Sequence, residues 1–178
     1  MVARLWVPPT IMTDNPQRQV RLVNPQSPTE LEATREIFRE YALSLGVDLC
    51  FQGFEAELAE LPGDYAAPAG SLWLVQVDGV WAACCALRPL NAPGISEACE
   101  MKRMYVRPAF RGLGLGKLLA TTVVQDGRRL GYERMYLDTM DQLTTARAIY
   151  QQLGFVEVPA YYHNPIPGVH YLKLELGA

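Results

Sequence analysis

A glycine-rich stretch in the second half of the chain constrains the fold more than any other feature. Residues 111–117 read Arg-Gly-Leu-Gly-Leu-Gly-Lys, after an alternating apolar run at 99–106 and before a helical pattern at 118–130. A strand that turns through glycines into a helix directs several backbone N–H groups at one place, with the positive end of the helix dipole behind them. Glycine lets the backbone approach an anion closely, and Arg111 and Lys117 add two cations. The stretch therefore predicts a site for a phosphorylated ligand.

The spacing of the glycines excludes two common phosphate motifs. A nucleoside-triphosphate loop needs Gly-x-x-x-x-Gly-Lys and then Ser or Thr, but Gly112 to Gly116 is one residue too short and Leu118 takes the place of the hydroxyl. A dinucleotide fingerprint needs Gly-x-Gly-x-x-Gly near an opening strand, whereas these glycines alternate and lie late in the chain. What remains is Arg-x-x-Gly-x-Gly, formed by Arg111, Gly114 and Gly116.

This pattern resembles the pyrophosphate-binding loop of the GNAT superfamily, the acyl-CoA-dependent N-acyltransferases. Residues 146–155, Ala-Arg-Ala-Ile-Tyr-Gln-Gln-Leu-Gly-Phe, resemble the closing phrase of that family, Ala-x-x-x-Tyr-x-x-x-Gly-Phe. The resemblance covers residues 71–176 and implies acetyl-CoA as co-substrate, without a metal. The residues that it implies for cofactor binding are Met104, Tyr105, Val106, Arg111, Gly112, Leu113, Gly114, Leu115, Gly116 and Lys117.

The order of predicted elements agrees with the resemblance. The patterns predict a strand at 20–23 and helices from Ser27 or Thr29 to about 45 and at 55–61. A hairpin of strands 72–77 and 80–87 follows. Beyond the glycine-rich stretch, the last predicted strands lie at 156–158 and 170–176. The resemblance implies an α/β (α+β) fold of the GNAT type, with a central mixed, mostly antiparallel sheet of six to seven strands flanked by about four helices. We expect a single domain from residue 19 to 178 and a flexible leader at residues 1–18.

Acyl transfer to an amine needs a base for the ammonium and an acid for the departing thiolate. Glu100 is the predicted base, because it lies six residues before Val106, where family members with a strand glutamate carry theirs. The alternative is that Glu100 pairs with Lys102 or Arg103 on a solvated strand end. Tyr150 is the predicted acid, since it matches the tyrosine of the closing phrase; the alternative is a packed tyrosine with a solvated hydroxyl. The resemblance implies direct attack by the amine in a ternary complex.

The resemblance implies a small-molecule amine or a peptide as the acceptor. The sequence does not choose between an amino acid, a polyamine, an aminoglycoside-like amine, a protein N-terminus or a lysine. By the family's architecture, the candidates for acceptor binding are Tyr41, Asp48, Phe51 and Tyr162. Phe51 could instead close the core beneath a loop. The chain also departs from the family at Leu143, where many members carry an asparagine that binds the cofactor arm.

Composition limits the other classes of function that the chain can have. Hydrophobic residues make up 49% of the chain, charged residues 20%, and the net charge is −3, which argues against nucleic acid as a general partner. No apolar run approaches the ~20 residues of a membrane span, and cysteines without metal spacing fit a reducing cytoplasm. A homodimer is a further expectation. Two alternatives to the enzyme stay open, a non-catalytic acyl-CoA sensor and an interaction module on the same fold.

Overall fold

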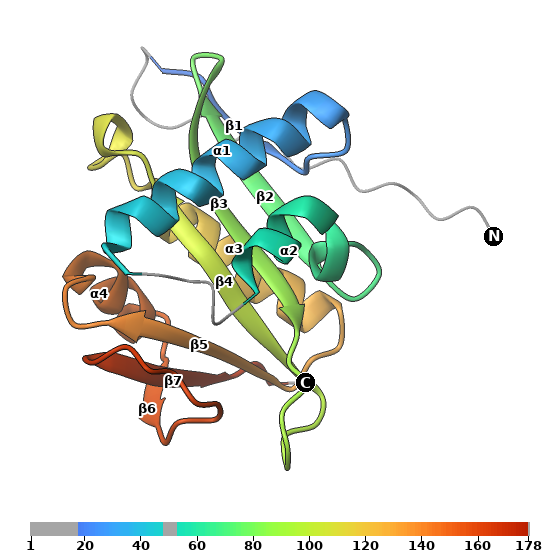
Figure 1. Cartoon of the computed structure of the whole chain (residues 1–178), viewed down its shortest axis with the longest axis vertical. Helices are drawn as coiled ribbons and strands as arrows, with labels where there is room; N and C mark the ends of the chain where they lie inside the picture. Colours follow the sequence, from blue (N-terminus) through green and yellow to red (C-terminus); the bar gives the residue numbers. More distant parts are fainter. Residues whose placement is uncertain (1–17, 48–52, 178) are drawn as a thin grey trace.

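The computed structural model describes residues 18–47 and 53–177, and its centre is an open sheet of seven strands (Figure 1). The strands are β1 (Val20–Val23), β2 (Ser71–Val77), β3 (Val80–Pro89), β4 (Ala98–Val106), β5 (Arg134–Met140), β6 (Val156–Val158) and β7 (Val169–Glu175). Their order is β1-β2-β3-β4-β5-β7-β6. The pair β4 and β5 is parallel and the other pairs are antiparallel. The predicted fold class, a mixed and mostly antiparallel sheet of the GNAT type, is confirmed.

Helices cover both faces of the sheet (Figure 1). The helices α1 (Pro28–Leu45) and α2 (Phe54–Glu60) lie on one face, and α3 (Leu115–Arg129) and α4 (Thr144–Gln152) lie on the other. The first helix begins as predicted, because the Ser27 hydroxyl accepts a hydrogen bond from the Glu30 N–H and the Glu30 carboxylate accepts one from the Ser27 N–H. It ends at Gly46, whose φ of 67° is the left-handed conformation that glycine adopts readily.

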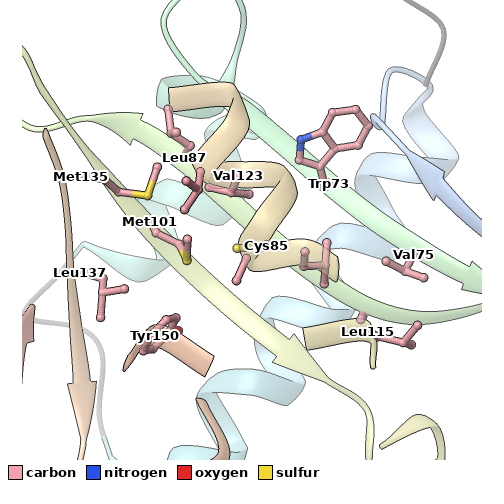
Figure 2. Close-up of a cluster of buried hydrophobic side chains, with 14 of the residues drawn as sticks. Trp73, Val75, Cys85, Leu87, Met101, Leu115, Val123, Met135, Leu137 and Tyr150 are labelled. Carbon is pink, nitrogen blue, oxygen red and sulfur yellow. The ribbon is translucent and has the colours of Figure 1, made fainter. Parts of the chain in front are cut away.

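The alternation of strand residues creates two cores, one on each face. Leu72 and Leu74 of β2 pack toward α1 and α2, whereas Trp73 and Val75 pack toward α3. Figure 2 shows the second of these cores, in which side chains of α3 meet those of the central strands. Full burial of a large apolar side chain contributes about 1.5–3 kcal/mol, so the two cores hold the helices in place around the middle of the sheet.

The helix after the glycine-rich stretch begins earlier than the pattern predicts. It starts at Leu115 rather than at residue 118, so Gly116 and Lys117 belong to its first turn. Gly114 caps this helix with a φ of 75° and no side-chain hydrogen bond. The sequence did not indicate this earlier start, because Gly114 has no side chain that could accept a capping hydrogen bond.

Some predictions fall outside the described residues. The acceptor candidates Asp48 and Phe51 and nearly all of the predicted leader lie there. Within the described part, Cys84, Cys85 and Cys99 are free and buried, as expected for thiols in strands. None of the described helices is long and apolar enough to cross a bilayer.

Candidate active site

The two parallel strands at the middle of the sheet separate, and the gap between them forms a cleft. The strands β4 and β5 pair only where Ala98–Glu100 faces Arg134–Tyr136, and they diverge beyond that point (Figure 1). Arg103 adopts a φ of 57°, next to a bulge that shifts the register of β3 and β4 between Cys84 and Ala86. The cleft is lined by Tyr41, Leu45, Met101, Lys102, Arg103, Met104, Asp138, Thr139, Met140, Leu143, Ala146, Tyr150, Asn164, Ile166 and Val169.

The glycine-rich stretch lies at the N-terminus of α3 and leaves open space in front of it. Gly112 and Gly114 have φ values of 81° and 75°, and a Cβ at either position would meet no protein atom within 4 Å. Gly116 is different, because a Cβ there would come within 3.2 Å of the Ile149 Cδ1 atom on α4. Arg111 and Lys117 are exposed. The N-terminus of α3 therefore has open space and two exposed cations beside it, an arrangement that suits an anion.

Tyr150 lies on α4 with its hydroxyl in the wall of the cleft. Its side chain is buried, and the hydroxyl donates a weak hydrogen bond to the Met104 sulfur at 3.7 Å. Burial raises the pKa of Tyr150 well above its ordinary value, and the negative charge of Asp138 adds to the effect. The phenol is therefore protonated at neutral pH and can donate a proton into the cleft.

Glu100 lies behind the cleft rather than in its wall. It is 1% exposed. Arg88 donates to Oε2 through Nε and Nη2 at 3.0 and 2.9 Å, and the Tyr161 hydroxyl donates to Oε1 at 2.8 Å. The ammonium of Lys102 lies 3.6 Å from the same Oε1. The pairing with Lys102 that the sequence left open is thus present, in a buried network and not on a solvated strand end.

Two charged side chains in the cleft wall were not predicted as site residues. The Lys102 ammonium lies 2.9 Å from Oδ1 of Asp138, on the opposite wall. Burial acts to raise the pKa of Asp138, but the charge of Lys102 and hydrogen bonds from Lys102 and Tyr162 outweigh it, so the pKa lies below its usual value. The sequence signal was a charged residue inside each of two largely buried strands, which needs a partner across the sheet.

A second cation in the wall, Arg103, is held by helix α2. It donates to both carboxylate oxygens of Glu57 on α2, at 2.9 and 2.6 Å, and its guanidinium lies 5.1 Å from the ring centre of Phe54. The described carboxylate partner of Arg103 is thus Glu57, whereas the other half of the alternative placed it with Glu100. It ties the bulge of β4 to α2.

Of the acceptor candidates, two lie in the described structure. Tyr41 lines the cleft from α1. Tyr162 packs against Tyr161 and Tyr171 with ring centres 5.3 to 5.5 Å apart, beneath the Lys102 ammonium at 5.9 Å. Leu143 lines the cleft as an apolar group and supplies no side-chain hydrogen bond in place of the asparagine of other members.

Known proteins are similar to this chain in sequence and in fold. A model of the acetyltransferase (GNAT) family matches residues 31–155. An uncharacterized N-acetyltransferase of Schizosaccharomyces pombe is 41% identical over 150 residues, which cover 84% of this chain and 90% of that protein. The crystal structure of a GNAT-family acetyltransferase from Staphylococcus aureus superimposes with a TM-score of 0.69 at 19% identity, over 88% of this chain and 99% of the other. An acetyltransferase of Salmonella typhimurium, solved with acetyl-CoA, has a TM-score of 0.64 at 19% identity, over 90% and 95% of the two chains.

The family match and the curated relative define this fold as that of an acyltransferase. The chain belongs to the acetyltransferase (GNAT) family, and it is an N-acetyltransferase.

Proposed function

We propose that this enzyme transfers an acetyl group from acetyl-CoA to a primary amine, by direct attack in a ternary complex. The observation that carries the proposal is the cleft between β4 and β5, which places a protonated tyrosine, Tyr150, in a wall continuous with the strand that leads to the glycine-rich N-terminus of α3. The solved structure of the Salmonella relative with acetyl-CoA supports the choice of co-substrate.

The cofactor would be held by backbone groups as much as by side chains. The N–H groups at the start of α3, with Arg111 and Lys117, would bind the pyrophosphate. Met104 and Val106 lie on the part of β4 that has no strand partner on the β5 side. Their backbone groups would bind the pantetheine amides as an added strand does. The thioester would then reach the cleft beside Tyr150.

The reaction needs one bond to form and one to break. The ammonium first gives up one proton, and the neutral nitrogen attacks the thioester carbon to form a tetrahedral oxyanion. The C–S bond then breaks as the thiolate takes the phenolic proton of Tyr150, and the second proton of the nitrogen restores the phenol. Glu100 is proposed as the base for that first proton: Lys102 gives a proton to Glu100 and takes the proton of the acceptor in its place. Its contact with the cleft is Lys102, which lines the wall and lies 3.6 Å from Glu100.

The first test is thiol release from acetyl-CoA against a panel of amines, amino acids and peptides, with a Tyr150→Phe variant. We expect Tyr150→Phe to lower kcat about 100-fold, with an unchanged Kd for acetyl-CoA, because it removes a proton donor and no binding group. Tyr132→Phe is the matched control, since the Tyr132 hydroxyl donates to the Ala69 carbonyl outside the cleft. Full activity of Tyr150→Phe across pH would contradict the acid. Acetyl-CoA binding without turnover of any amine would indicate the sensor instead.

A further inference from the structure

Asp138 is the one carboxylate among the described residues that line the cleft. Its side chain is 17% exposed, whereas that of Glu100 is 2% exposed. The other charges in the wall have carboxylate partners already, Arg103 with Glu57 and Lys102 with both Glu100 and Asp138. An acceptor amine that enters the cleft as a cation therefore meets a single anionic group in the wall.

The structure already shows an ammonium seated at this place. The Lys102 ammonium lies 2.9 Å from Asp138 and 5.9 Å from the ring centre of Tyr162, a distance typical of a cation over an aromatic face. Asp138 stands opposite Tyr171 in the β5–β7 register, and Tyr161 packs against that tyrosine. A carboxylate flanked by tyrosine rings suits a primary ammonium, because it combines a charged hydrogen-bond acceptor with aromatic faces.

Lys102 has a second anion within reach. Its ammonium lies 3.6 Å from Oε1 of Glu100, so it can share or leave Asp138 without losing a carboxylate partner. We propose that Asp138 binds the ammonium group of the acceptor beside the thioester, with Lys102 retained by Glu100. Asp138 then selects basic, protonated amines over arylamines that are neutral at pH 7. This proposal rests on the proposed function and adds the charge of the acceptor to it.

A pair of CoA thioethers tests the proposal without an identified acceptor. S-(2-aminoethyl)-CoA carries an ammonium where the attacking nitrogen would arrive, and S-propyl-CoA is its neutral counterpart of equal length. Isothermal titration should give the wild-type enzyme a Kd for the ammonium compound about tenfold or more below that for the propyl compound. Asp138→Asn should abolish this preference and leave the Kd for S-propyl-CoA unchanged, while Asp138→Glu should retain a preference.

Lys102→Met separates acceptor binding from simple charge balance. If Asp138 binds the acceptor, Lys102→Met keeps or increases the preference, and the double variant Lys102→Met/Asp138→Asn has none. A preference that returns in the double variant would overturn the proposal, because Asp138 would then serve only to neutralise Lys102. Equal wild-type affinity for the two thioethers would also overturn it. If neither thioether binds, and acetyl-CoA gives no thiol release, the proposed function itself fails and this inference with it.

Discussion

Two buried hydroxyl groups, those of Ser71 and Thr139, have no hydrogen-bond partner within residues 18–47 and 53–177. A buried hydroxyl without a partner costs about 1–3 kcal/mol. Ser71 lies on β2, outside the set of residues that line the cleft, whereas Thr139 lines it. The two hydroxyls have the same cost in different surroundings. Of the two, only Thr139 can gain a hydrogen-bond partner from a ligand in the cleft.

Replacement of each hydroxyl gives a matched pair of predictions. Ser71→Ala and Thr139→Val should each stabilise the ligand-free enzyme by about 1 kcal/mol, or roughly 2–4 °C in Tm for a chain of this size. The further rise in Tm that acetyl-CoA produces should shrink in Thr139→Val and stay unchanged in Ser71→Ala. Thermal scans with and without acetyl-CoA measure both effects. A lower Tm for ligand-free Thr139→Val would show that its hydroxyl has a partner.

Single residues differed in how far their position could be predicted. Tyr150 could be found because it stands in a local phrase of fixed spacing, and the structure places it in the cleft wall. Asp138 could not, because its importance depends on where β5 parts from β4 and on Lys102 across the gap. Local patterns in the sequence do not encode such a contact. The burial of Glu100 likewise depends on Arg88 and Tyr161, which lie 12 and 61 residues away along the chain.

At the scale of elements, α3 has a glycine in the left-handed conformation at each end. Gly114 precedes its first residue with a φ of 75°, and Gly131 follows its end with a φ of 86°. A Cβ at either position would meet no atom within 4 Å, so substitution costs only backbone strain, about 1 kcal/mol for alanine. The two positions differ in function, because only Gly114 belongs to the proposed pyrophosphate site.

Gly114→Ala and Gly131→Ala should therefore lose similar stability but differ in cofactor affinity. Both should lower the free energy of unfolding by about 1 kcal/mol. Gly114→Ala should also weaken acetyl-CoA binding at least tenfold, because a methyl group would stand where the phosphate oxygens approach the backbone. Urea unfolding and titration with acetyl-CoA measure the two quantities separately. Equal acetyl-CoA affinity in the two variants would remove the glycine-rich stretch from the cofactor site.

Most elements followed from local pattern, and the exceptions have a physical cause. Hydrophobic periodicity, the expected helix start at Ser27 or Thr29 and the hairpin of strands 72–77 and 80–87 predicted their elements to within a few residues. The start of α3 differed, since Gly114 offers no side chain as a capping signal. The bulge at Arg103 was not predicted either. A positive φ at an arginine is unfavourable by itself, and here it accompanies the bidentate contact with Glu57.

At the scale of the whole molecule, this contact joins two layers. Glu57 belongs to α2 and Arg103 to β4, with side chains 11% and 3% exposed. The Tyr65 hydroxyl donates a further hydrogen bond to Glu57 at 2.8 Å. Loss of one partner of a buried ion pair costs about 3–5 kcal/mol. The pair thus fixes α2 against β4, the strand that forms one wall of the cleft.

The pH dependence of stability should report on this pair. Burial acts to raise the pKa of Glu57, but hydrogen bonds from Arg103 and Tyr65 and the charge of Arg103 outweigh it, so the pKa lies below its ordinary 4.5. In the folded state Glu57 therefore binds fewer protons than in the unfolded state. Its contribution is fully present above about pH 4.5 and is lost as the pH falls through the folded pKa.

Glu57→Gln should consequently unfold more easily at pH 7, by about 3–5 kcal/mol, and its stability should decline less steeply below about pH 4.5 than that of the wild type. Glu60→Gln is the control, because Glu60 is exposed at the end of the same helix. The free energy of unfolding of Glu60→Gln should match that of the wild type at pH 7 and below about pH 4.5. Urea unfolding between pH 3 and pH 7 gives the comparison. A Glu57→Gln curve parallel to the wild-type curve would mean that Glu57 titrates alike in the folded and unfolded states, and that the join between α2 and β4 depends on apolar packing rather than on charge.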